Sequence, residues 1–179
     1  MLARNTTSCG RRRQWIPIDQ GDGTLLVPLT RGLFTRIDAI DLDRIRHYSW
    51  HRGSARNGGR TYARTRIKRK ITEMHRLLMD PPAGLEVDHI NRNILDNRRC
   101  NLRICTHAQN AANRHGWTPH TSRHRGISWD KNRERWVAQI YQNGKTIWYH
   151  SFSTEEEAHQ AYEAKAREVF GEFYVPYNV

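Results

Sequence analysis

The sequence predicts an α+β protein made of two small parts, and three observations lead to this prediction. Short alternating runs of apolar and polar residues recur along the chain, separated by turn residues. Residues 86–113 follow the order strand, turn, strand, helix. Residues 136–170 follow the order strand, Asn-Gly turn, strand, amphipathic helix. We therefore expect one part with an N-terminal β-rich extension, and a second part in which a three-stranded antiparallel sheet packs on one helix.

Composition and charge narrow the class of protein and the kind of partner that can be expected. The chain has 179 residues, 37% of them hydrophobic, and a mean hydropathy of −0.88, which favours two small cores over one large core. No apolar run approaches the roughly 20 residues that cross a bilayer, so we expect no membrane partner. The net charge of +12 results from 30 Lys and Arg against 18 Asp and Glu, spread along the chain. Such charge binds polyphosphate backbones by releasing condensed counterions, so a nucleic-acid partner is expected.

The boundary between the parts is expected in residues 115–124, where Gly, Pro and hydroxyl residues interrupt any periodicity. The first part then spans residues 1–114 and the second part spans residues 125–179.

The first part begins with two strands that can pair, residues 24–29 and 33–37, of which the former contains Pro28 and suits an edge. Asp41 can cap a short helix that runs to about residue 48. The side chains expected to face the core from this helix are Ile40, Ile45 and Tyr48.

A basic hairpin is expected next, with strands at residues 60–67 and 70–72. Such a hairpin is either a solvated edge or a ribbon along a phosphate backbone, and the overall charge favours the ribbon. Its expected DNA contacts are Arg64, Arg66 and Lys68.

A short helical turn at residues 75–79 should stop before two prolines. Two strands are then expected, at residues 86–90 and 101–104. Thr106 can cap the following helix, with Gln109 completing a capping box.

In the second part, Asn143 and Gly144 predict a hairpin between residues 136–141 and 146–152. Ser153 can cap the last helix with Glu156, and Gly171 can end it. The helix positions expected in the core are Ala158, Ala161, Tyr162, Ala166, Val169 and Phe170. Trp136 is assigned to the core, whereas Trp148 would lie on the uncovered face of the sheet if the helix covers Ile147 and Tyr149.

Four side chains of the first part form a set suited to cutting a phosphodiester. Asp88 supplies an anionic oxygen for Mg²⁺ or Mn²⁺, and Asn110 can add a carbonyl oxygen. His89 has a reference pKa near ~6.5, so its neutral imidazole can deprotonate an attacking water. Asn101 would hold that imidazole or clamp the turn. Arg114, one helical turn past Asn110, could bind the same phosphate.

The same segment resembles the HNH endonucleases, in particular the phage-type homing branch. The resemblance is close over residues 74–114 and looser over 24–73. It rests on four runs, residues 74–79, 87–91, 95–103 and 109–113. It implies a ββα-metal (His-Me finger) fold, one divalent ion and DNA as substrate. By this resemblance Asp88 matches the metal ligand, His89 the general base, Asn101 the central Asn and Asn110 the helix ligand, which is His in other branches.

Residues 123–177 resemble the Apetala-two/ethylene-response-factor DNA-binding domain, through the runs 125–127, 136–140, 148–152 and 154–162. That family lays a three-stranded sheet in the DNA major groove and backs it with a helix. The implied groove or phosphate contacts are Arg125, Gln139, Tyr141 and Trp148. Further phosphate contacts are expected from Arg133, Arg135 and Lys145. Ser128, Tyr141 and His150 depart from the plant pattern, so no base preference is carried over.

The three cysteines, Cys9, Cys100 and Cys105, form no closely spaced framework, and the basic N-terminus has no apolar signal-like segment. We therefore expect a reducing, cytoplasmic setting in a bacterial or phage-infected cell and no secretion. No Cys-x-x-Cys pair occurs, so no structural zinc is expected.

Together these features predict a site-specific, homing-type DNA endonuclease that acts on double-stranded DNA as a monomer. A metal-bound phosphate carries little sequence information, so the second part would place the DNA. Two alternatives are a DNA-binding regulator with an inactive nuclease site and a structure-directed nuclease of low specificity.

Overall fold

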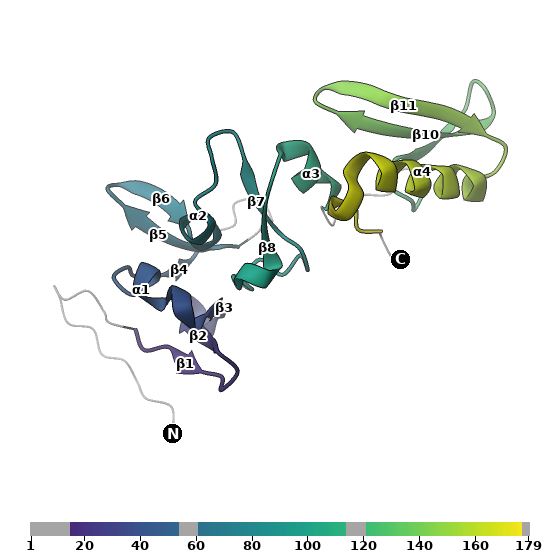
Figure 1. The fold of residues 1–179 in the computed structure, drawn as a ribbon. Coiled ribbons are helices and arrows are strands. Elements are labelled where there is room, and N and C mark those ends of the chain that lie inside the picture. The colour runs from purple at the N-terminus through teal and green to yellow at the C-terminus, as the bar shows by residue number, and fades with distance from the viewer. Residues whose placement is uncertain (1–14, 54–60, 114–120, 177–179) are drawn as a thin grey trace. The chain divides into compact units, whose positions relative to one another are not determined.

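The computed structural model describes residues 15–53, 61–113 and 121–176, which form two compact units (Figure 1). The first unit is Met1–Asp80 with Asn93–Arg103, and the second is Pro81–Arg92 with Ile104–Val179. This division does not coincide with the expected linker: residues 121–124 group with the second unit, and residues 115–120 lie outside the described ranges. Both units mix short helices with small antiparallel sheets, which makes the protein α+β. Within the described ranges, no helix is long and apolar enough to cross a membrane.

The first unit contains two three-stranded antiparallel sheets and two short helices. One sheet has the order β1 (Ile18–Asp19), β2 (Thr24–Pro28), β3 (Phe34–Asp38), and the other β4 (His51–Arg52), β5 (Ala63–Ile67), β6 (Lys70–Glu73). The helices are α1 (Leu42–Ile45) and α2 (Met74–Met79), and 3-10 turns occupy η1 (Thr30–Gly32), η2 (Ala39–Asp41) and η4 (Arg99–Asn101). The buried core consists of Leu25, Val27, Leu29, Ile37, Ile45, Trp50, Ala63, Met74 and Leu78.

Most local predictions for this unit are confirmed. β2 pairs with β3, and the β5–β6 hairpin turns at Lys68 and Arg69, whose positive φ values of 44° and 68° are those of a type I′ turn. The helix expected after Asp41 is shorter than predicted, because α1 ends at Ile45. The inward placement of Ile40 is wrong, since that side chain is 78% exposed.

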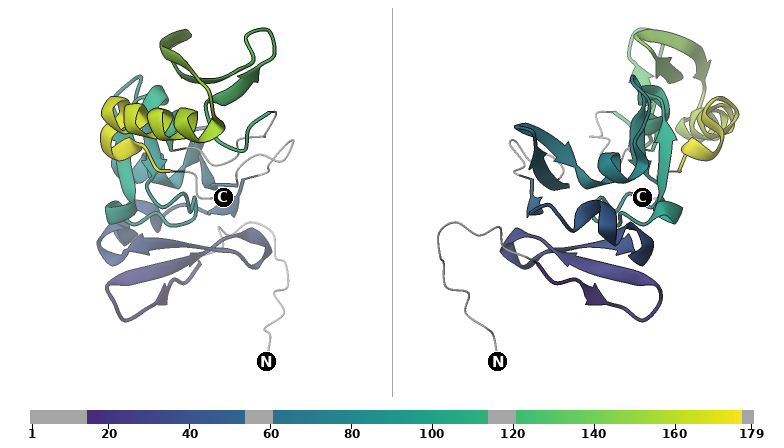
Figure 2. Two further views of the ribbon diagram at one scale, coloured as in Figure 1. Left: turned by 90° about the vertical axis from the view of Figure 1, so that its right-hand side faces the viewer. Right: turned by 60° about the vertical axis from the view of Figure 1, so that its left-hand side comes forward.

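The second unit joins a strand–helix layer to a three-stranded sheet backed by a helix. β7 (Glu86–His89) pairs with β8 (Leu102–Cys105), and α3 (His107–Ala112) follows. The sheet has the order β11 (Lys145–Phe152), β10 (Arg135–Gln142), β9 (Ile127–Asp130), and α4 (Glu155–Phe170) lies across one face of it before η5 (Gly171–Phe173) (Figures 1 and 2). The buried core consists of Ala112, Ile127, Ala138, Ile140, Ala158, Tyr162, Ala166 and Phe170.

Helix caps and turns in this unit follow the sequence signals closely. Thr106 and Gln109 form the predicted capping box, and Asn143 and Gly144 have positive φ values of 51° and 80° in the β10–β11 turn. The cap predicted for α4 is wrong by one position: Thr154 caps the helix and Glu157, not Glu156, closes the box. A threonine one residue later serves as well as Ser153, so the signal for the cap was ambiguous.

The predicted face of Trp148 is wrong. Trp148 packs against the core under α4, whereas Ile147 and Tyr149 are 46% and 43% exposed. The cause is a register shift between Ile140 and Tyr141: Tyr141 pairs with Thr146, but Ile140 pairs with Trp148. This β-bulge turns the rest of β11 over, so Trp148 shares the covered face with Ile140.

Candidate active site

One wall of the candidate site is formed by β7 and α3 in the second unit. Glu86 and Asp88 are two residues apart on β7, so both point to the same side of the strand, toward α3. The Nδ2 atom of Asn113, directly after α3, donates to both carboxylate oxygens of Asp88 at 2.9 and 2.8 Å. Asn110, one turn earlier, donates its Nδ2 to Glu86. The structure therefore pairs Asp88 with Asn113 and Asn110 with Glu86.

The oxygen atoms on this wall fit a hard cation. Four acceptors converge on Asn113 Nδ2, which carries two hydrogens: both oxygens of Asp88, the carbonyl of His89 at 2.9 Å and the carbonyl of Ile90 at 3.5 Å. The Glu86 carboxylate and the Asn110 amide lie on the same wall. Carboxylate and amide oxygens are the ligands that Mg²⁺ and Mn²⁺ prefer. No group of three or more His, Cys, Asp or Glu suited to a metal occurs among the described residues, so a metal here would depend on asparagine as well.

His89 is the last residue of β7, where the chain turns away. Its side chain is buried, with 4% exposed, as is that of Asp88. Its carbonyl accepts from the backbone N–H of Arg92 at 2.9 Å, and Arg92 has a positive φ of 64° in the turn. Arg92 also donates its Nε to the side-chain and backbone oxygens of Asn113, both at 3.1 Å. The turn after His89 and the end of α3 are thus held together by side-chain hydrogen bonds.

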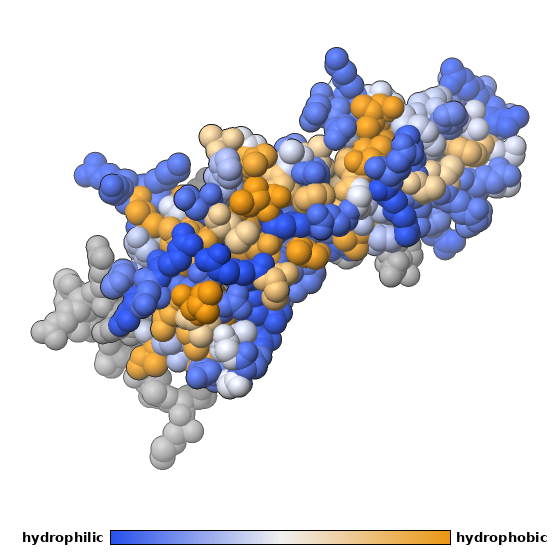
Figure 3. Space-filling model, viewed as in Figure 1, coloured by the Kyte–Doolittle hydropathy of each residue, from blue (hydrophilic) through white to orange (hydrophobic). Residues whose placement is uncertain are grey.

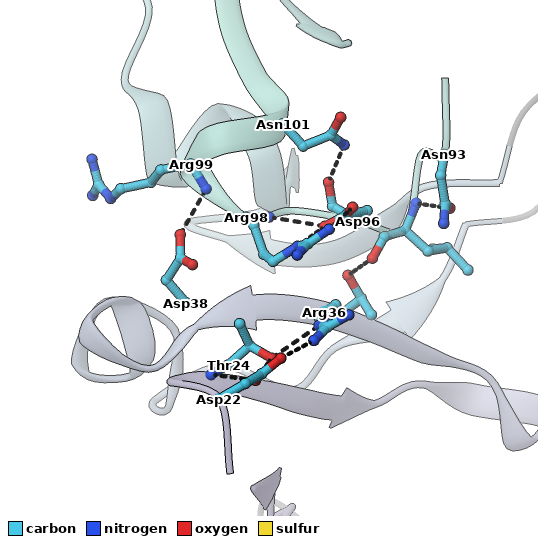
Figure 4. A network of polar contacts seen from close by, with 11 residues as sticks. Asp22, Thr24, Arg36, Asp38, Asn93, Asp96, Arg98, Arg99 and Asn101 are labelled. Atoms are coloured by element: carbon cyan, nitrogen blue, oxygen red, sulfur yellow. Dashed lines mark hydrogen bonds and ion pairs between the residues drawn. The ribbon is translucent and has the colours of Figure 1, made fainter. Parts of the chain in front are cut away.

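Asn101 belongs to the first unit, where it clamps the turn before β8 (Figure 4). Its Nδ2 donates to the carbonyl of Asp96 at 2.8 Å, and Asn101 is only 5% exposed. This hydrogen bond ties Asn101 to the turn, and the role of Asn101 in the site stays a prediction. Segment 95–97 runs parallel beside β3, with backbone hydrogen bonds that join Arg36 to Leu95 and Asn97.

Ion pairs fix the same turn to the N-terminal extension. The guanidinium of Arg98 donates to both carboxylate oxygens of Asp96, and these hydrogen bonds raise the pKa of Arg98 above its ordinary value (Figure 4). Arg99 binds both oxygens of Asp41 at 2.8 and 2.6 Å, and its backbone N–H donates to Asp38 at 2.7 Å. The extension therefore supports the segment that carries the central asparagine.

The basic side chains of the hairpin in the first unit are of two kinds. One forms an ion pair within the hairpin, and the others are exposed. Arg64 is paired with Glu73 at 2.7 Å, whereas Arg66 and Lys68 are exposed, and the hairpin tip is hydrophilic (Figure 3). Arg66 and Lys68 line a groove of about 440 Å³, together with His47, Tyr48, Ser49, His51, Thr65 and Ile67. Arg114, also predicted to contact DNA, lies outside the described residues.

Five of the predicted DNA contacts in the second unit are exposed: Arg133, Arg135, Gln139, Tyr141 and Lys145. Gln139 and Tyr141 lie on β10 and Lys145 on β11, and Tyr141 is 67% exposed. Arg133 donates to the Tyr149 hydroxyl at 2.7 Å, and Arg135 donates to Ser153 at 3.1 Å.

The other two predicted contacts are differently placed. Trp148 is in the layer under α4, as described above. Arg125 donates to the carbonyls of Ala112 and Ala111, both at 2.7 Å, at the end of α3.

The segment that forms this wall is similar to a known protein family. A model of HNH endonucleases matches residues 80–112, which contain Asp88, His89, Asn101 and Asn110, and a model of the AP2 domain matches residues 122–172. Protein 3.8 of Escherichia phage T7 is 33% identical over 92 residues, which cover 51% of this chain and 75% of that protein. The chain belongs to the HNH endonuclease family.

A second relative of this protein is an uncharacterized HNH endonuclease of Acanthamoeba polyphaga mimivirus. It is 35% identical over 98 residues, which cover 55% of the HNH chain. The chain spans 50% of the length of that mimivirus protein. No solved structure matches the HNH chain significantly. The HNH match and the AP2 match cover separate segments of the chain.

Asn113, Arg92 and Glu86 touch the site of the HNH chain, although no role was predicted for them. The signal for Asn113 was available, because residues three apart on a helix lie on one face and Asn113 follows Asn110 by three. Glu86 likewise precedes Asp88 by two on a strand. Arg92 gave no such signal, because its partner Asn113 is 21 residues away.

Proposed function

We propose that the protein is a site-specific DNA endonuclease of the homing type, which hydrolyses a phosphodiester bond with one divalent metal ion, Mg²⁺ or Mn²⁺. The observation that carries this proposal is the convergence of Asp88, Glu86, Asn110 and Asn113 between β7 and α3. Glu86, Asp88 and Asn110 lie in the segment that matches the HNH family, and Asn113 directly follows it. We infer a ββα-metal arrangement from β7, β8 and α3.

Each site residue receives one role in this proposal. Asp88 and Asn110 hold the ion, and Asn113 keeps the Asp88 carboxylate in one orientation through its two hydrogen bonds. His89 accepts the proton of the attacking water at an imidazole nitrogen. Asn101 keeps the preceding turn in place through the Asp96 carbonyl. When bound, the ion would stabilise the leaving oxygen and the charge that develops on phosphorus.

The three-stranded sheet of the second unit, formed by β9, β10 and β11, would place the DNA. The face of the sheet opposite α4 presents Gln139 and Tyr141, and the exposed Arg133, Arg135 and Lys145 add positive charge. We propose that this surface and the exposed edge of the basic hairpin bind one extended, asymmetric duplex site, with the protein acting as a monomer in the cytoplasm.

The test is cleavage of a plasmid library by the purified chain in Mg²⁺ and in EDTA. Wild-type protein should cut at defined positions only with the metal, and His89→Ala should lose cleavage while its Kd for DNA stays within about threefold, because the base acts on the reaction and not on binding. His150→Ala, which removes an exposed histidine of β11 on the same side of the strand as Trp148, is the matched control and should still cut.

The outcomes separate the proposed function from its two alternatives. Binding without cleavage in any metal would support a DNA-binding regulator. Metal-dependent cuts scattered over the library would support a nuclease of low specificity. Cleavage by His89→Ala at the wild-type rate would refute the role of His89.

A further inference from the structure

The C-terminal end of α3 is held by two arginine side chains. Arg125 donates Nη2 to the carbonyl of Ala111 and Nη1 to that of Ala112, each at 2.7 Å. Arg92 donates Nε to the carbonyl of Asn113 at 3.1 Å. The last carbonyls of a helix have no partner within the helix, and a cation there also interacts favourably with the helix dipole. Three successive carbonyls at this end are therefore capped by guanidinium groups.

Arg125 lies in the turn that precedes β9 of the C-terminal sheet. The carbonyl of Gly126 accepts from the backbone N–H of Gln139 at 2.9 Å. Gly126 has a positive φ of 74°, and a Cβ atom there would lie 2.1 Å from the ring of Tyr162. The ring of Tyr162 is buried against this backbone; burial raises the pKa of Tyr162, and the nearby charge of Arg125 acts in the opposite direction. The backbone next to Arg125 is thus held against β10 and α4.

The same helix end is part of the C-terminal core. Ala112 is 1% exposed and belongs to the buried cluster of Tyr162, Ala166 and Phe170. Arg92 adds a second connection, because its Nη2 donates to the carbonyl of Val175 at 2.9 Å. A helix as short as α3, with six residues, is not stable alone, so these contacts decide where it lies.

The same helix end also carries the candidate site. Asn110 and Asn113 contact Glu86 and Asp88, while the carbonyls of residues 111–113 contact the two arginines. We propose that Arg125 is a positioning residue of the nuclease site: it holds α3 on the C-terminal domain and thereby sets Asn110 and Asn113 against β7. This inference rests on the proposed function, and it replaces the DNA contact that the AP2 resemblance implies for Arg125.

The experiment compares Arg125→Ala, Arg125→Lys and wild type by two measurements, the single-turnover cleavage rate at saturating DNA and the Kd for DNA in EDTA. Arg125→Ala should lower the saturating rate at least about tenfold and raise the Mg²⁺ concentration that gives half of it, because small displacements of a catalytic group are costly. Its Kd should stay within about threefold of wild type. Arg125→Lys, which can still reach one carbonyl, should recover part of the rate.

Two further variants serve as controls, one for the loss of a DNA contact and one for the loss of an unrelated surface charge. Arg133→Ala, on the exposed surface, should raise the Kd, as a true DNA contact does. Arg167→Ala, on α4 and paired with Glu163, should change neither measurement. If Arg125→Ala instead raises the Kd while its saturating rate equals that of wild type, Arg125 is a DNA contact and the proposal is wrong. If Arg125→Ala does not fold, the same two measurements on Arg125→Lys decide the question.

Hydrogen exchange separates this inference from the proposed function. If wild-type protein cuts no DNA under any condition, the proposed function fails, but the structural claim remains measurable. Amide exchange in residues 104–113 should then be faster in Arg125→Lys than in wild type, with exchange in β11 unchanged. Equal exchange in α3 would overturn the positioning role whether or not the protein is a nuclease.

Discussion

Asn113 donates its side-chain amide to both carboxylate oxygens of Asp88, at 2.9 and 2.8 Å, and accepts a hydrogen bond from Arg92 on its own Oδ1. Both Asn113 and Asp88 are buried, with 2% and 4% exposed. A buried carboxylate is costly without donors, and this contact supplies a donor to both oxygens of Asp88 and holds the carboxylate in one orientation. The orientation of the carboxylate matters because a metal ligand must present its oxygens at a fixed place.

Replacing Asn113 by alanine should weaken the site without removing any proposed ligand. Loss of the amide removes one donor shared by both Asp88 oxygens, and we expect the free energy of unfolding to fall by about 1–3 kcal/mol. Cleavage should need more Mg²⁺, by roughly tenfold or more, as for other groups that orient a metal ligand. Urea denaturation and a metal titration of cleavage measure the two effects. Asn132→Ala, in an exposed turn, is the control, and equal metal dependence for both variants would contradict this role of Asn113.

Features set by neighbouring residues could be predicted from the sequence. The capping box of Thr106 and Gln109 and the turn at Asn143 depend on contacts within a few residues, and both are confirmed. The prediction for the face of Trp148 was wrong because it depends on how two strands pair, and not on neighbouring residues alone. A two-residue turn with unbroken pairing would place Ile140 opposite Ile147, and the bulge that shifts Ile140 to Trp148 leaves no mark in the alternation.

The candidate site shows the same limit. Asp88, His89 and Asn110 could be selected from residue type and spacing, and their roles stay predictions. Their supports could not be found in this way, because they join residues far apart in the chain. Arg125 binds the carbonyl of Ala112 across 13 positions, and a backbone carbonyl has no signature in the sequence. A family resemblance assigned Arg125 to DNA, whereas its guanidinium lies at the end of α3.

Gly126 should be much less tolerant of alanine than Gly144, although both have positive φ, 74° and 80°. At Gly144 a Cβ atom meets nothing within 4 Å, so we expect only the backbone cost of about 1–2 kcal/mol. At Gly126 the Cβ atom would lie 2.1 Å from the Tyr162 ring, and overpacking of about 1–3 kcal/mol adds to that cost. Urea denaturation of the two variants measures the difference, and equal losses would show that the ring moves aside.

Glu73 should make the stability of the first unit depend on acid. Hydrogen bonding with His75, and then with Arg64, lowers the pKa of Glu73 from 4.5 to about 2, against the opposing effect of burial. Because the pKa of Glu73 is lowered in the folded state, its contribution to stability is present above about pH 4.5. This contribution is lost as the pH falls toward 2.

Glu73→Gln should therefore be less stable than wild type near neutral pH, and the difference should shrink below pH 4.5 and vanish near pH 2. Urea denaturation across this range measures it. Glu168→Gln, at an exposed ion pair with Lys165, should change little, because such pairs contribute weakly. A loss for Glu73→Gln that is the same at every pH would mean that its charge is not the cause.

Removing the exposed charges of the basic hairpin should change how salt affects DNA binding. Arg66 and Lys68 are exposed beside one groove, whereas Arg64 is occupied by Glu73, so these two side chains are available to phosphates. Each phosphate contact contributes about 0.9 to the slope of log Kd against log salt, so Arg66→Ala with Lys68→Ala should lower the slope by about 2. Binding titrations at several salt concentrations measure this slope.

The control pair is Lys165→Ala with Arg167→Ala. It removes charges of α4 that bind Glu168 and Glu163, and it should leave the slope unchanged. Equal slopes for both double variants would place the DNA away from the hairpin.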